Sequence, residues 1–166
     1  MYLKNLINVI NNIDIKNINE LNNDITTCVG TIYILGNGGS ASIASHACND
    51  LFKIKKKNAR CLTDNIATFS AYSNDVSYDM CFVEQLKYLL TPSDLVICLS
   101  TSGNSMNILN AYKYSKDICK TRFIHGNKVN FDFTIPSDDT QIIEDIFRLF
   151  FIAYANDFTK CTNTRT

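Results

Sequence analysis

Apolar residues recur at helical spacing over the first part of the chain, residues 1–28. They fall at Leu3, Leu6, Ile7, Ile10, Ile15, Ile18, Leu21 and Ile25. Recurrence at every third or fourth position predicts amphipathic helices. The polar stretch near Asn12–Asp14 predicts a break, so we expect two helices in this part of the chain.

From residue 29 onward, short apolar runs alternate with helical periods. The runs predict buried strands at 31–35, 60–63, 94–99, 121–124 and 131–135. The periods predict helices at 40–52, 66–72, 82–90, 105–116 and 139–158, the last with Ser137 and Asp138 as candidate N-caps. This alternation predicts one α/β domain, a three-layer sandwich around a mainly parallel sheet. Its parts are the N-terminal helices (1–28), the core (29–158) and a tail (159–166).

Charge and composition narrow the classes of partner. Lys+Arg and Asp+Glu number 16 each, so the chain lacks the cationic excess of a nucleic-acid-binding protein. No apolar run is long enough to span a bilayer and the N-terminus has no secretory signal, so we expect a cytoplasmic protein with no membrane partner. The 7 cysteines include no C-x-x-C pair, which argues against a disulfide framework and a structural zinc site.

Two polar loops each follow a predicted strand and precede a predicted helix. They read GNGGSA at 36–41 and STSGNS at 100–105. Ligands of parallel sheets bind at the carboxyl ends of the strands. Glycines let a backbone approach a ligand, and hydroxyl groups with free amides at a helix start suit the oxygens of a phosphate. The two loops together predict a site for a phosphorylated ligand.

The first loop also fits a second interpretation. Gly36, Gly38 and Ala41 match the loose dinucleotide pattern G-x-G-x-x-[GA], and Asp64 lies near the end of the next predicted strand. The chain would then be a small NAD-binding domain, which leaves the loop at 100–105 without a role. A P-loop nucleotide site is excluded because the pattern G-x-x-x-x-G-K-[ST] is absent.

Five segments together carry a family resemblance. They are GNGGSAS at 36–42, LTDN at 62–65, SND at 73–75, LSTSGNS at 99–105 and PSDDT at 136–140. In this order and spacing they resemble the phosphoheptose isomerase family of sugar isomerase (SIS) domains. The resemblance implies a flavodoxin-like sheet and a homotetramer, or a homodimer, with active sites between subunits. It also implies aldose–ketose isomerisation of a sugar phosphate of the sedoheptulose 7-phosphate type.

The resemblance also assigns substrate contacts, position by position. The phosphate contacts of the family fall on Ser100, Thr101, Ser102 and Ser105. The remaining predicted contacts are Asn37, Gly38, Gly39, Ser40, Asn74 and Asp75.

The catalytic groups implied by the family differ here at several positions. Its His–Glu pair becomes His46 and Asp50, and the Gln and His of its last helix become Glu144 and Ile152. The predicted catalytic residues are therefore Asp50, His46 and Glu144. Some members hold zinc with these four groups, so the same three residues are a candidate zinc site. The helix at 139–158 contains no histidine, so the second His of the family is lost.

Two further expectations concern the end of the chain. His125, the only other histidine, follows a predicted strand and is expected in an exposed loop. The helix at 139–158 is apolar nearly all round, which indicates burial on more than one side. In a chain this short, such a helix favours a subunit interface.

Two functions are consistent with these residues. The first is an isomerase that acts on a heptose phosphate through an enediol, with Asp50 or Glu144 as the base and His46 assisting. The alternative is a non-catalytic SIS protein that senses a sugar phosphate or serves as a protein-interaction scaffold, which the missing His favours. We prefer the isomerase because three of the four catalytic positions keep groups that can exchange protons.

Overall fold

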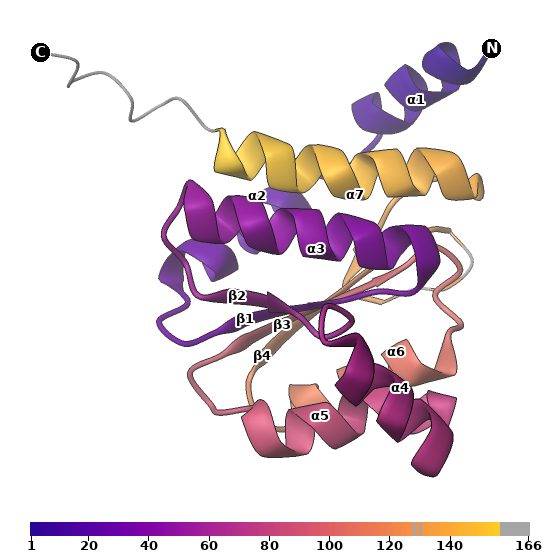
Figure 1. The fold of residues 1–166 in the computed structure, drawn as a ribbon. Helices are drawn as coiled ribbons and strands as arrows, with labels where there is room; N and C mark the ends of the chain where they lie inside the picture. The colour runs from indigo at the N-terminus through magenta and orange to yellow at the C-terminus, as the bar shows by residue number, and fades with distance from the viewer. Residues whose placement is uncertain (128, 130, 157–166) are drawn as a thin grey trace, which may run out of the picture.

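A parallel sheet of five strands forms the centre of the molecule in the computed structural model (Figure 1). The structure describes residues 1–127, 129 and 131–156, so the predicted tail at 159–166 lies outside the described residues. The strands are β1 (Ile32–Leu35), β2 (Ala59–Cys61), β3 (Leu95–Ser100), β4 (Lys120–His125) and β5 (Phe133–Thr134). Their order, β2-β1-β3-β4-β5, is the flavodoxin-like order. The predicted fold class is confirmed.

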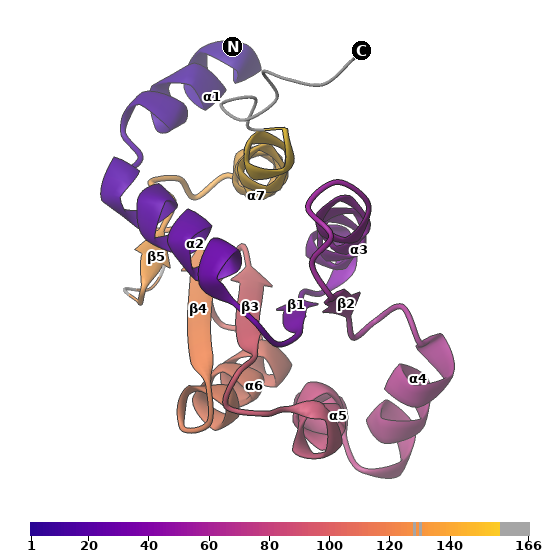
Figure 2. The same cartoon turned by 90° about the vertical axis from the view of Figure 1, so that its left-hand side faces the viewer.

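Helices cover both faces of the sheet, as Figures 1 and 2 show. One face carries α2 (Ile15–Thr27), α3 (Gly38–Lys53) and α7 (Thr140–Ala155), with α1 (Tyr2–Asn11) on the outer side of α7. The other face carries α4 (Ile66–Asp75), α5 (Cys81–Leu89) and α6 (Met106–Lys116), with a 3-10 turn at Tyr78–Met80. None of the helices in the described ranges combines the length and the apolar character that a bilayer crossing requires.

The helix starts follow local side-chain chemistry. The predicted break between the first two helices is confirmed, and Asp14 caps α2 by accepting a hydrogen bond of 2.9 Å from the Lys16 amide. The predicted N-caps of α7, Ser137 and Asp138, are wrong by two residues and by one residue. Asp139 is the N-cap, because its carboxylate accepts the free amide of Gln141 at 2.9 Å. The Ser137 hydroxyl accepts the amide of Asp139 instead.

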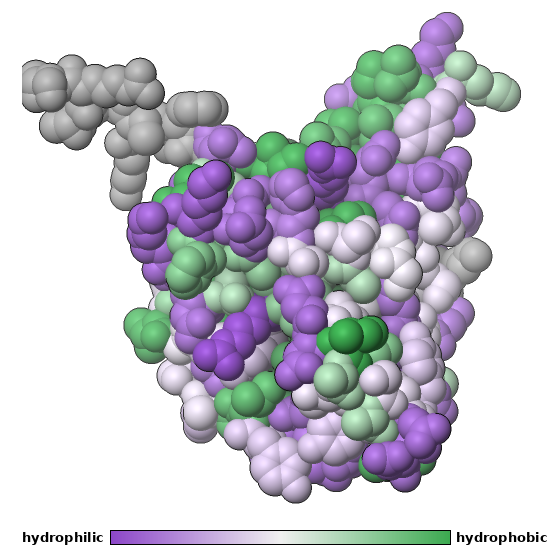
Figure 3. Space-filling model, viewed as in Figure 1, coloured by the Kyte–Doolittle hydropathy of each residue, from purple (hydrophilic) through white to green (hydrophobic). Residues whose placement is uncertain are grey.

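Helix α1 leaves part of its apolar stripe uncovered. Leu3 and Ile7 are 70% and 57% exposed, and the space-filling view shows hydrophobic side chains gathered on this helix (Figure 3). Tyr2 attaches the helix to α7 by donating a hydrogen bond of 2.8 Å to Asp145. Exposed leucine and isoleucine on a single helix form a surface that favours a further protein contact.

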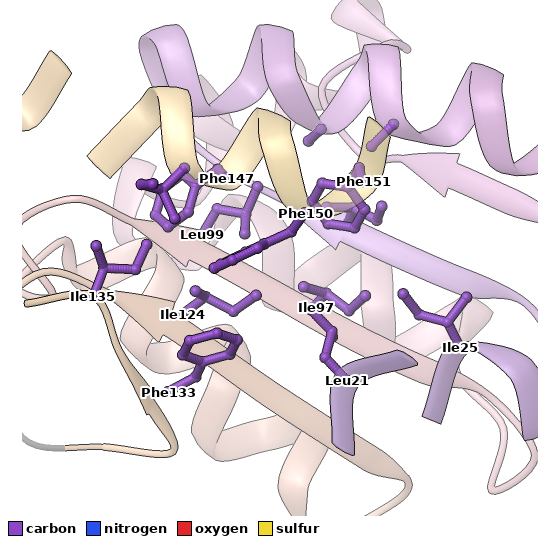
Figure 4. Close-up of a cluster of buried hydrophobic side chains, with 14 of the residues drawn as sticks. Leu21, Ile25, Ile97, Leu99, Ile124, Phe133, Ile135, Phe147, Phe150 and Phe151 are labelled. Carbon is purple, nitrogen blue, oxygen red and sulfur yellow. The ribbon is translucent and has the colours of Figure 1, made fainter. Parts of the chain in front are cut away.

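The core beneath α7 combines its aromatic side chains with the branched side chains of the strands (Figure 4). Phe147 and Phe151 are buried, and they pack above Ile97, Leu99 and Ile124 of the sheet. Burial of α7 on more than one side is therefore confirmed. Within the described residues, this helix shares the core with the sheet and contacts the helices α1, α2 and α3 of the same chain. Leu149 is still 42% exposed, so the subunit interface expected on α7 stays a prediction.

Candidate active site

The two polar loops lie at one edge of the sheet, as the sequence predicts. β1 and β3 are paired in parallel, so the loops that follow them start side by side. The side-chain amides of Asn37 and Asn107 join the loops through two reciprocal hydrogen bonds of 2.9 Å. The Tyr78 hydroxyl donates a third bond, of 3.0 Å, to the Asn37 oxygen. No sequence pattern indicates a role for Asn107 and Tyr78, because their partner Asn37 lies far away along the chain.

The loop at 100–105 gathers its hydroxyl groups at the start of α6. Ser100 ends β3, and its hydroxyl accepts the Gly103 amide at 3.1 Å and lies 3.4 Å from that of Ser105. The Ser102 hydroxyl accepts the Asn104 amide at 3.2 Å. Gly103 takes a positive φ of 68°, which a glycine adopts without strain. These hydroxyls gather at the N-terminus of α6, and hydroxyls and amides at a helix start are the donors that suit phosphate oxygens.

The glycine turn brings Glu144 to the start of α3. Gly38 has a φ of 52° with open space around its Cα, and Gly39 lies against the Glu144 carboxylate. The Ser40 hydroxyl donates to the same carboxylate at 3.4 Å. The partial positive charge at a helix N-terminus stabilises a carboxylate in this position. α7 therefore places Glu144 beside two of the predicted substrate contacts, Gly39 and Ser40.

Substitution of Gly39 by alanine is expected to displace the Glu144 carboxylate, because the added Cβ would overlap with it. Alanine suits a helix better than glycine does, so the free energy of unfolding should change by less than about 1 kcal/mol. We expect isomerase turnover to fall at least about tenfold, as for loss of a positioned acid–base group. A double-mutant cycle with Glu144→Gln provides the control. Gly39→Ala should lower turnover less when Glu144 is already glutamine. If it lowers turnover as much in the Glu144→Gln variant as in the unsubstituted protein, this explanation is contradicted.

His46 and Asp50 form a pair one helical turn apart on α3. The His46 Nε2 lies 3.2 Å from the Asp50 carboxylate, and their side chains are 54% and 16% exposed. His46 also lines a hollow of about 220 Å³ between α3 and α7. The imidazole can therefore meet a ligand in this hollow while its other side is bound to a carboxylate, an arrangement that suits proton transfer.

The candidate zinc ligands do not converge in this chain. Glu144 is directed to Gly39 and Ser40, whereas His46 is paired with Asp50. Across the ranges that the structure describes, no three His, Cys, Asp or Glu side chains are grouped closely enough to hold a metal ion. The three residues therefore do not fit a zinc ion in the arrangement seen here, and no step below uses one.

Asn74 and Asp75 lie at the exposed end of α4. The Asn74 amide donates a hydrogen bond of 2.8 Å to the Asp75 carboxylate. α4 reaches the glycine turn only indirectly, through the Tyr78 hydroxyl in the next turn of the chain. Within one subunit, Asn74 and Asp75 do not lie next to the two polar loops. Their role as sugar contacts stays a prediction.

The expectation of an exposed loop for His125 is wrong. His125 is the last residue of β4, is fully buried, and pairs in register with Ser100, where the loop at 100–105 begins. Its Nδ1 lies 2.6 Å from the Gly126 carbonyl oxygen, and its Nε2 accepts the Phe131 amide at 3.1 Å. Both ring nitrogens are thus used by the backbone. The strand predicted at 121–124 extends one residue further, to His125. Periodicity does not predict this, because histidine does not belong to an apolar run.

The burial of His125 predicts that the protein becomes less stable to unfolding as the pH falls. Burial lowers the pKa of its imidazole below 6.5, and the nearby Asp132 only partly opposes this. The unfolded chain therefore binds the proton first, so stability is full above about pH 6.5 and falls as the pH drops through the folded pKa. We expect the loss of Tm between pH 7.5 and 5.5 to be smaller in His125→Gln than in the unsubstituted protein. Equal losses in the two proteins would contradict the prediction.

Comparisons with known proteins agree with this geometry. The SIS domain family matches residues 1–119. A phosphoheptose isomerase of Aliarcobacter butzleri is 37% identical over 132 residues, which cover 72% of this chain and 70% of the relative. One from Helicobacter pylori is 37% identical over 130 residues, with 70% and 68% covered.

Solved structures agree on the fold. A phosphoheptose isomerase from Neisseria gonorrhoeae superposes with a TM-score of 0.83 at 23% identity and covers 94% of both chains. One from Francisella tularensis superposes with a TM-score of 0.80 at 25% identity, with 90% of this chain and 88% of that chain covered.

Proposed function

Because this chain belongs to the phosphoheptose isomerase family of SIS domains, we propose that it interconverts an aldose and a ketose form of a heptose phosphate. The substrate we assign is of the sedoheptulose 7-phosphate type. The observation that supports this best is the pairing of the two loops at one sheet edge by Asn37 and Asn107. It brings a phosphate-binding helix start and a glycine turn together.

The phosphate of the substrate would be held by the loop at 100–105. Its candidate ligands are the hydroxyls of Ser100, Thr101, Ser102 and Ser105, aided by amides at the start of α6. The sugar would then extend past Asn37, Gly38 and Gly39 toward α3 and α7. Glu144 and the His46–Asp50 pair lie along this direction.

Proton transfer in the proposed reaction needs no oxidant. The His46–Asp50 pair takes a proton from the carbon beside the carbonyl, which leaves an enediol, and returns it to the neighbouring carbon. A second proton passes between the two oxygens, for which Glu144 provides an acid–base group. Asp50 supplies the negative charge that makes the pair a base, and its carboxylate lies 3.2 Å from the His46 Nε2, where it orients the imidazole.

Isotope exchange tests this proposal directly. Purified protein is incubated with sedoheptulose 7-phosphate in deuterated water, and exchange beside the carbonyl is followed by NMR. We expect exchange and aldose product well above a protein-free control. Binding of the sugar phosphate without exchange would replace the isomerase with the alternative of a non-catalytic sensor or scaffold. A protein that neither binds nor exchanges would overturn both.

We further propose a homotetramer, with the exposed stripe of α1 as one of its contacts. Leu3 and Ile7 are the residues that support it, since water-exposed apolar side chains on a helix favour association. The mass in solution tests this, with Leu3→Asp/Ile7→Asp expected to lower it. A cytoplasmic location is proposed as well. Zinc binding stays a prediction, and it would require Glu144 to leave Ser40.

A further inference from the structure

A guanidinium group lines the hollow between α3 and α7. Besides Arg148, its polar lining consists of His46 and Ser42, and the remaining residues are Ile43, Ala47, Phe151 and Ile152. Two helices that run side by side, as Figure 1 shows, form its walls. A small polar ligand in this hollow would meet one imidazole, one hydroxyl and one permanent positive charge.

Arg148 occupies a defined place on α7. Glu144, Arg148 and Ile152 follow one another at intervals of four residues, so they share a face of the helix. The Glu144 carboxylate lies against Gly39 at the start of α3. Arg148 and Ile152 line the hollow beside His46. The sequence has an isoleucine where the resemblance implies a histidine, and Arg148 stands one helical turn before it.

The positive charge of Arg148 is available to a ligand. The neighbouring carboxylates have other partners: Glu144 accepts from Ser40, Asp145 from Tyr2, and Asp50 is paired with His46. Within the described ranges, no ion pair joins Arg148 to a carboxylate. The side chain is exposed at its position on α7, so it can turn into the hollow at little cost.

We propose that Arg148 is a catalytic residue, which donates hydrogen bonds to the substrate oxygen that becomes negatively charged as the enediol forms. This inference rests on the proposed function. When the base removes the carbon-bound proton, the electron pair moves to the carbonyl oxygen. The guanidinium stabilises that charge and keeps its own protons, because arginine is not deprotonated in proteins. The charge disappears when the proton is returned to the neighbouring carbon.

An arginine is better suited to stabilising negative charge than to transferring a proton. Its planar fork offers two parallel donors, which match the two adjacent oxygens of an enediol. A histidine at position 152 could both give a proton and stabilise charge, whereas the guanidinium can only stabilise charge. The proton transfers therefore remain with His46, Asp50 and Glu144, as assigned above.

Steady-state kinetics of Arg148→Met and Arg148→Lys with sedoheptulose 7-phosphate test the proposal. Loss of a donor to an oxyanion commonly lowers kcat by about a hundredfold or more. We expect that loss in Arg148→Met, with KM changed less than about threefold, and a partial recovery in Arg148→Lys. Arg60→Met, which removes an exposed guanidinium from a different hollow, is the matched control and should keep the original kcat.

The outcomes separate this inference from the proposed function. If the unsubstituted protein exchanges deuterium and Arg148→Met retains its kcat, only the role of Arg148 is overturned. A rise in KM without a fall in kcat overturns it as well, because it indicates binding alone. If the unsubstituted protein shows no exchange, the proposed function fails and this inference fails with it. Thermal unfolding of each variant reports folding, and Arg148→Lys decides the question should the methionine variant unfold.

Discussion

Replacement of Asp50 by asparagine is expected to lower kcat for the isomerisation by about a thousandfold. A positioned acid–base group contributes roughly two to four powers of ten to the rate. Asparagine has nearly the same size and can stay in contact with His46, but it carries no negative charge and accepts no proton at neutral pH. The measurement is kcat, together with deuterium exchange beside the carbonyl.

Asp50→Glu is the informative companion of this variant. Glutamate keeps the charge and is the residue that the resemblance implies at this position, so at least about a tenth of the turnover should remain. The two variants should have similar melting temperatures, since the Asp50 side chain is still 16% exposed and its contact with His46 is with a neighbour on the same helix. Near-normal turnover in Asp50→Asn would remove the His46–Asp50 pair from the mechanism.

Truncation of Phe147 to alanine is expected to cost the fold about 3–5 kcal/mol of unfolding free energy. The Phe147 ring is fully buried, between α7 and the sheet, in the core shown in Figure 4. Its removal leaves a cavity that neighbouring aromatic rings cannot fill without leaving their rotamers. Urea unfolding at one fixed protein concentration measures the change, because assembly of subunits would otherwise contribute to it.

Phe52→Ala provides the same truncation at an exposed position. Phe52 is on α3 with 65% of its surface exposed, so we expect less than about 1 kcal/mol from its loss. Comparable costs for the two substitutions would mean that α7 is less tightly packed on the sheet than its burial indicates. A large effect confined to Phe52→Ala would point to a subunit contact on α3.

Ile152 stands at the position where the resemblance implies the second histidine of the family. Ile152 lines the hollow beside His46, so the departure lies in the wall of the candidate site and not at a remote surface. The missing group would have served as acid or ligand there. Arg148, one turn earlier on the same helix, is the group that this structure offers in its place.

Sequence patterning alone determined the layers, the strands and the site loops. Helical and strand periods placed each described strand and α-helix to within a few residues, because buried faces must repeat with the geometry of the backbone, whereas the 3-10 turn at Tyr78–Met80 was not predicted. The two donor-rich loops could be recognised because glycine and hydroxyl residues after a buried strand have few structural reasons to gather. The pairing of His46 with Asp50 also followed, since residues four apart share a helix face.

Other features required the tertiary structure, because they depend on contacts between distant parts of the chain. The burial of His125 depends on Phe131 and the strand that ends at Ser100. The partner of Glu144 is Gly39 rather than a metal site, since α7 packs with its start beside the start of α3. Apolar side chains on several sides of α7 pack against the sheet, α1 and α3 of the same chain. Periodicity reports which faces are buried, and only packing decides what buries them.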